Sequence, residues 1–178
     1  MRDANIQPVI KHFPGMGSAD GNTDFSSATT DPLSSLLTRD IIPYQQLVSM
    51  KPDVMVGNMI VPDLTNGQPA IWSPEAITLL RQLGYESSVV YSDSLTAKAI
   101  PGTLEDAALK AWMADVDVAL IVQKRDETAS IESYVNVITS QGTAQVDSGS
   151  LDKTTLNDST KRLFERKNID PCTITVAM

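Results

Sequence analysis

The sequence predicts an α/β protein in which strands and helices alternate around a parallel sheet. Three observations indicate this fold. Apolar runs of strand length occur at residues 6–12, 54–60, 88–93 and 116–122, helical patterns lie between them, and polar side chains stand where the runs end. Such alternation is typical of βα units. Because parallel strands end at one edge, we expect these polar side chains on a common rim.

The number of units sets the size of the fold. A closed (β/α)8 barrel needs about 250 residues, and the 178 residues here hold four units. The chain therefore corresponds to a partial (β/α)8 TIM barrel, with an open four-stranded sheet as the alternative. We find no repeat and no linker, so residues 1–178 are expected to form one domain.

Local signals place the elements in order. A long loop rich in Gly, Ser, Thr and Asp follows the first strand, and loops of this length are often functional. Asp40 is expected to cap the next helix, with Pro43 in its first turn. Ser73 is expected to cap the following helix and Gly84 to end it, and Thr103 to cap a helix over about 104–113.

Two further helices are predicted over residues 128–141 and 155–167, from apolar side chains that recur at helical spacing. Trp72 and Trp112 each lie beside a helical pattern. We therefore expect both indoles to pack in the core rather than to serve as platforms for sugars.

Composition excludes several classes of function. The formal net charge is −8 and the chain has one histidine and one cysteine, Cys172. Nucleic acid and anionic membranes would be repelled, and neither a metal centre nor a bound cofactor is expected. No apolar run approaches a membrane span, and no signal peptide is evident at the N-terminus. We expect a soluble chain, whose location the sequence leaves open because a longer parent could be exported.

Five segments in order resemble family 3 glycoside hydrolases of the β-N-acetylglucosaminidase (β-hexosaminidase) branch. Lys11-His12-Phe13-Pro14-Gly15 is similar to that family's Lys-His-Phe-Pro-Gly-His-Gly loop, and Arg39–Tyr44 to its Arg-Asp-Leu-x-Pro-Phe helix start. The other similar segments are Val54–Val56 with Pro69–Ser73, Leu80–Tyr85, and Val89–Leu95. The resemblance implies strands five to eight of the family barrel, without a cofactor, and cleavage of N-acetylglucosamine from glycans or cell-wall fragments.

The resemblance also assigns roles to individual residues. It makes Asp93 the nucleophile of a retaining glycosidase, which needs one carboxylate to form a glycosyl-enzyme and a second group to protonate the leaving oxygen. From the residues alone, Asp93 could instead cap a following helix. Lys11 and His12 match the residues that bind sugar hydroxyls. Asn58 and Asp63, in the next loop, are further candidates for substrate binding.

The proton donor departs from the family pattern. Met16 stands where the family loop has a histidine, and the Asp-Ser-His stretch of the best-known members is absent. A Gly-Asn-Thr-Asp loop resembles another branch of the family and makes Asp24 the candidate acid/base. Asp20 and Asp31 are the alternatives within the same loop.

Half a barrel would leave strand edges open, which invites pairing. We therefore expect a homodimer, a complementary barrel half, or a longer parent enzyme. Two functions follow: a retaining β-N-acetylhexosaminidase, incomplete as a lone chain, or a catalytically silent carbohydrate-binding or interaction module derived from one.

Overall fold

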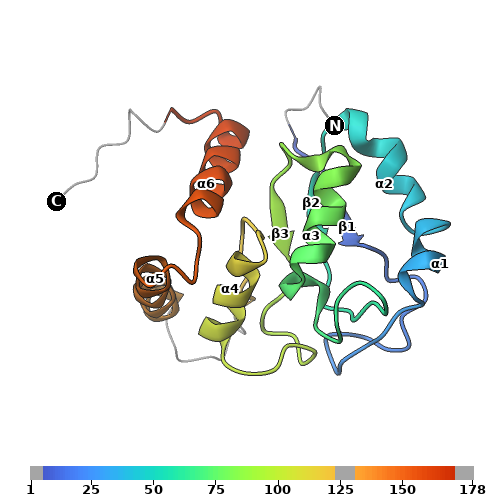
Figure 1. Ribbon diagram of the computed structural model, residues 1–178, viewed down its shortest axis with the longest axis horizontal. Helices are drawn as coiled ribbons and strands as arrows, with labels where there is room; N and C mark the ends of the chain where they lie inside the picture. The colour runs from blue at the N-terminus through green and yellow to red at the C-terminus, as the bar shows by residue number, and fades with distance from the viewer. Residues whose placement is uncertain (1–5, 123–130, 171–178) are drawn as a thin grey trace.

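The computed structural model describes residues 6–122 and 131–170 (Figure 1). Its centre is a parallel sheet of three strands in the order β1 (Val9–Phe13), β2 (Asp53–Val56) and β3 (Val90–Ser92). The predicted α/β class is confirmed. Each strand overlaps one of the first three predicted runs, although the ladders are shorter than the apolar runs.

The fourth predicted strand is reduced to one parallel bridge, between Tyr91 and Val118. On either side of this bridge, a side chain rather than a main-chain carbonyl accepts a main-chain hydrogen bond. The carboxylate of Asp117 accepts the N–H of Val90 at 2.8 Å, and the hydroxyl of Ser92 accepts the N–H of Leu120 at 2.8 Å. The segment therefore follows β3 without forming a regular ladder.

The helices lie beside both edges of the sheet and across its middle. Figure 1 shows α1 and α2 on the side of β1, α3 across the middle, and α4, α5 and α6 on the side of β3. Their bounds are α1 Leu33–Leu37, α2 Ile42–Leu47, α3 Pro74–Leu80, α4 Leu104–Met113, α5 Ile131–Asp147 and α6 Lys153–Lys167. Short turns of other helix types cover Val48–Met50, Ala70–Trp72 and Arg81–Tyr85. The first residues of the helix predicted over 128–141 lie outside the described residues.

Capping signals explain where several helices begin and end. The hydroxyl of Ser73 accepts the N–H of Ala76 at 3.1 Å, and that of Thr103 accepts the N–H of Asp106 at 3.1 Å. Gly84 has a φ of 102°, which ends the helical run after α3. The predicted cap at Asp40 is wrong, because α2 starts without a side-chain cap. The Asp40 carboxylate instead accepts the N–H of Gly17 at 3.3 Å.

The core lies on one face of the sheet. Phe13 contacts the ring of Tyr44 edge-on, with centroids 5.1 Å apart, and the hydroxyl of Tyr85 donates to the Tyr44 carbonyl. The predicted packing role of Trp72 is confirmed: it is 8% exposed and donates to the Ala107 carbonyl, while Trp112 packs partly buried against the same core. On the opposite face, the paired residues Lys11 and Met55 are exposed or half-buried. One face of the sheet is thus packed and the other is open.

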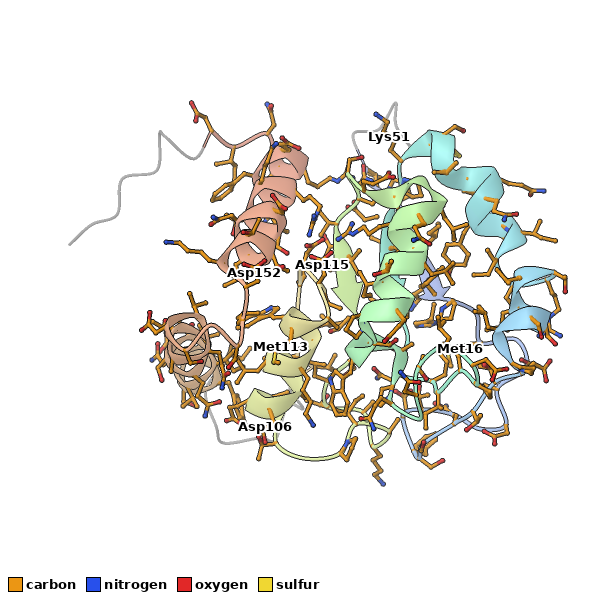
Figure 2. All side chains as sticks on the ribbon, in the orientation of Figure 1. Met16, Lys51, Asp106, Met113, Asp115 and Asp152 are labelled. Atoms are coloured by element: carbon orange, nitrogen blue, oxygen red, sulfur yellow. The ribbon has the colours of Figure 1, made fainter. Side chains whose placement is uncertain are left out.

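Helix α6 is fastened to the sheet by buried ion pairs. The carboxylate of Asp117 is fully buried and pairs with Arg162 of α6 at 2.6 Å and with Arg81 at 3.2 Å. Asp115, which Figure 2 shows near the end of α4 on the side of α6, also pairs with Arg162, at 2.9 Å. Arg166 of α6 reaches Asp53 at the start of β2. Charge therefore holds this hydrophilic helix at the amino ends of the strands.

Candidate functional site at the carboxyl rim

The structure brings His12 and Asp93 together at the carboxyl ends of the strands. His12 lies in the last part of β1, and Asp93 directly follows β3. The His12 Nε2 atom is 3.7 Å from Asp93 Oδ2, with 24% and 19% of the two side chains exposed. Two residues 81 positions apart in sequence thus form one partly buried polar pair.

The main chain fixes the position of Asp93. Its N–H donates to the carbonyl of Val56 at 2.8 Å, and its Oδ1 accepts the N–H of Ser94 at 2.8 Å. The next helix, α4, begins only at Leu104 and has Thr103 as its cap. The alternative interpretation of Asp93 as a helix cap is therefore wrong, and Oδ2 faces His12.

Burial favours the neutral form of the His12 imidazole. Burial lowers the pKa of His12 below 6.5, the positive charge of Lys11 acts in the same direction, and Asp93 and Asp24 oppose the shift only in part. A neutral imidazole offers one donor and one acceptor. Such a pair of sites suits hydroxyl groups, which both donate and accept.

The loop that carries Asp24 is tied to the segment after Asp93. The N–H of Ala99 donates to the carbonyl of Thr23 at 3.0 Å, and the N–H of Lys98 to the carbonyl of Asp24 at 3.4 Å. The side chain of Asn22 accepts the N–H of Asp24 at 2.9 Å. The Asp24 carboxylate itself is exposed, accepts no hydrogen bond from the described residues, and acts on His12 through charge.

The other two acids of this loop have structural partners. Asp20 Oδ1 accepts the N–H of Thr29 at 2.7 Å, and the Asp31 carboxylate pairs with Arg39 at 3.2 Å. Both carboxylates hold the fold of the loop. Among the three candidates for the proton donor, Asp24 is the one whose charge acts on His12.

Asn58, Asp63 and Lys11 lie differently with respect to this pair. Asn58 is 1% exposed and its Nδ2 donates to the Ser94 carbonyl at 2.9 Å, which brings it next to Asp93. Lys11 is exposed beside His12. Asp63 is exposed in a turn with a φ of 65°, and no contact among the described residues joins it to His12 or Asp93. Sequence reasoning missed Ser94, because main-chain hydrogen bonds leave no pattern of residue types.

A cavity of about 610 Å³ opens beside β1, between that strand and α2. Lys11 and His12 line it together with Met16, Asp40 and Tyr44. Figure 2 shows Met16 among the loops on the side of α1. The cavity shares Lys11 and His12 with the rim but does not include Asp93, so it extends the site along the open edge of β1.

Two absences can be stated for the described part of the chain. No cluster of three or more His, Cys, Asp or Glu side chains there could hold a metal ion. None of the helices in residues 6–122 and 131–170 is long and apolar enough to cross a membrane.

The fold and the rim define an α/β domain with its polar site where barrel enzymes carry their active sites. Residues 1–165 match the glycosyl hydrolase family 3 N terminal domain. The chain therefore belongs to glycosyl hydrolase family 3, which confirms the resemblance found in the sequence.

Relatives and solved structures agree with this assignment. Beta-hexosaminidase LpqI of Mycobacterium tuberculosis is 38% identical over 141 residues, which are 74% of this chain and 36% of that protein. A family 3 glycosyl hydrolase structure from Mycobacterium smegmatis superimposes with a TM-score of 0.82 at 35% identity, over 93% of this chain and 52% of that one. The M. tuberculosis LpqI structure superimposes with a TM-score of 0.84 at 32% identity, over 96% of this chain and 50% of that one. The chain thus spans between about a third and a half of these proteins.

Proposed function

We propose that this chain forms the nucleophile-bearing half of a retaining β-N-acetylhexosaminidase, with Asp93 as the nucleophile. The observation that carries the proposal is the pair of His12 and Asp93, 3.7 Å apart at the rim. The name beta-hexosaminidase, carried by the M. tuberculosis relative, supports a hexosamine as the terminal sugar.

The reaction would proceed in two displacements. Asp93 Oδ2 attacks the anomeric carbon while the bond to the leaving oxygen breaks, and Asp24 gives that oxygen its proton. Water then attacks the anomeric carbon of the glycosyl-enzyme, passes a proton to Asp24 and releases the Asp93 carboxylate. Bound sugar would cover the loop and exclude water from the carboxylate of Asp24, which is exposed in the free protein.

Lys11 and His12 would hold the sugar ring over Asp93. The ammonium group of Lys11 is exposed beside the rim and offers three donors. The neutral imidazole of His12 offers a donor and an acceptor, and its place next to Asp93 puts any hydroxyl bound there within reach of the nucleophile. Asp63 is a further candidate for substrate binding, since its side chain is exposed in the loop that follows β2.

We also propose a partner for the open edge of the sheet. We infer that four βα units correspond to strands five to eight of the family barrel, and that β1, an edge strand of the described sheet, pairs with a strand from the complementary half. The cavity along β1 and the exposed side chain of Val9, 42% accessible, support this place of contact. A homodimer through the same edge is the alternative. Sedimentation analysis distinguishes the homodimer from the complex with the complementary half. A monomer that does not bind the complementary half would contradict both assemblies.

The enzyme proposal is tested with 4-nitrophenyl N-acetyl-β-glucosaminide, using the chain alone and with the complementary half. Turnover that Asp93→Asn abolishes supports the proposal, whereas a fully active Asp93→Asn variant excludes Asp93 as nucleophile. Met16, which stands where the family loop has a histidine, favours a second function, a silent carbohydrate-binding module. Binding of N-acetylglucosamine without turnover in either preparation would select that function.

A further inference from the structure

A short segment, Ser94–Ala99, is bonded to both carboxylate-bearing parts of the rim. At its start the Ser94 N–H donates to Asp93 Oδ1 at 2.8 Å. At its end the N–H groups of Lys98 and Ala99 donate to the carbonyls of Asp24 and Thr23, at 3.4 and 3.0 Å. The segment therefore sets where the Asp24 loop lies relative to Asp93.

The buried amide of Asn58 anchors the start of this segment. Its Nδ2 donates to the Ser94 carbonyl at 2.9 Å, and the same carbonyl accepts the N–H of Ala97 at 3.2 Å. The next residue, Leu95, donates its N–H to the Leu120 carbonyl at 2.9 Å. Ser94 is thus held at both of its peptide groups, one on Asp93 and the other on Asn58.

The other end of the same amide has no partner. Asn58 Oδ1 is buried and accepts no hydrogen bond within the described residues, and a buried acceptor without a donor destabilises a fold. An apolar side chain of the same shape would avoid that penalty. Packing in the core alone therefore does not explain an asparagine at this position. The hydrogen bond from Asn58 to Ser94 is the contribution that an apolar side chain could not make.

We propose that Asn58 is a positioning residue that holds Asp93 through Ser94. By fixing the Ser94 carbonyl it keeps the Ser94 N–H on Asp93 Oδ1, so that Oδ2 stays directed at His12. The same contact stabilises the Ser94–Ala99 segment that carries the Asp24 loop. The catalytic consequence rests on the proposed function, whereas the effect on Ser94 follows from the geometry alone.

The test replaces Asn58 by Leu, which keeps the shape and removes the donor, and by Asp, which removes the donor while ionised. Amide hydrogen exchange of Ser94, followed by NMR, is the first measurement. We expect exchange at Ser94 to accelerate about tenfold in Asn58→Leu, while amides in α3 and the midpoint of denaturation stay near the wild-type values. In Asn58→Asp, the Ser94 amide should exchange faster than in the wild type while the carboxylate is ionised. As the pH is lowered and the carboxyl becomes a donor, protection of this amide should return to that of the wild type at the same pH.

Kinetics provide the second measurement. If the wild-type preparation turns over the nitrophenyl substrate, Asn58→Leu should lower kcat at least about tenfold and leave KM unchanged, because only the orientation of the nucleophile is affected. Wild-type protection at Ser94 in Asn58→Leu would overturn the proposal, as would accelerated exchange throughout the protein, which indicates a purely structural role. Absence of turnover in the wild type counts against the glycosidase proposal, and the Ser94 measurement still decides this one.

Discussion

Arg166 on α6 reaches Asp53 at the start of β2, with 2.7 Å between Nη2 and Oδ1. Asp53 is 1% exposed, and its Oδ1 also accepts the N–H of Val89 at 3.0 Å. Burial raises the pKa of Asp53, and the Val89 N–H and Arg166 both counteract the rise. The guanidinium of Arg166 thus stabilises the Asp53 carboxylate, which is buried at the start of the strand.

Removal of that cation should destabilise the protein. Arg166→Met leaves the stem of the side chain but deprives the buried Asp53 of its ion pair, and loss of one partner of a buried pair costs about 3 kcal/mol. Denaturant unfolding measures the change. Lys167→Met, at an exposed position of the same helix, is the matched control and should change stability by less than about 0.5 kcal/mol. Equal stability of the two variants would show that α6 is held by other contacts.

The pH dependence of stability should show the burial of His12. Because the pKa of His12 lies below 6.5 in the fold, the unfolded chain binds a proton at pH values where the native protein does not. Stability should therefore fall as the pH is lowered through 6.5 toward the native pKa. Since the chain has a single histidine, NMR titration reports this pKa without ambiguity. The variant His12→Gln should lack this part of the pH dependence, and a titration above 6.5 would contradict the expectation.

Much of the fold follows from local rules in the sequence. The capping hydroxyls of Ser73 and Thr103 and the stop at Gly84 act within a few residues, so a sequence pattern contains all the information needed. The fourth predicted strand forms only one bridge, because Asp117 and Ser92 bind main-chain N–H groups across the sheet. An apolar run does not indicate that side chains will replace main-chain hydrogen-bond partners.

The ion pairs of α6 mark the limit of sequence reasoning in a different way. Arg162 and Arg166 are four residues apart and share one side of α6, whereas Asp115 and Asp117 lie in the irregular segment after α4. Nothing in the sequence pattern says that Arg162 meets these two aspartates, or that Arg166 meets Asp53 at the start of β2. The same holds for the rim: the ends of two strands predicted a shared edge for His12 and Asp93, but not the role of Ser94 between Asp93 and Asn58.

Gly15 should be intolerant of any side chain. A Cβ at this position would lie 2.3 Å from the Cβ of Asp40, and the φ of Gly15 is 152°. Gly15→Ala must displace Asp40 and its bond to Gly17, and should destabilise the protein by about 2 kcal/mol. Gly21→Ala, where the nearest atoms are 3.7 Å away, is the control in the same loop and should be nearly neutral. Thermal unfolding of both variants checks this, and similar midpoints would show that the Asp40 contact yields easily.

The assignment of Asp24 as acid/base can be tested by choice of leaving group. Nitrophenolate leaves without a proton, whereas an alkoxide needs one, so general acid catalysis matters mainly for alkyl glycosides. In an active preparation Asp24→Asn should lower turnover of a methyl N-acetyl-β-glucosaminide at least about 100-fold. Release of nitrophenol in the first turnover should be little affected, and azide should accelerate later turnovers by replacing water as nucleophile.

Asp20→Asn provides the matched control, because Asp20 belongs to the same loop but holds the N–H of Thr29. An amide oxygen can still accept that hydrogen bond. Asp20→Asn should therefore affect both substrates equally and by less than about tenfold, with no rescue by azide. If Asp20→Asn shows the leaving-group dependence and Asp24→Asn does not, the proton comes from Asp20, and the free carboxylate of Asp24 serves only to adjust the charge around His12.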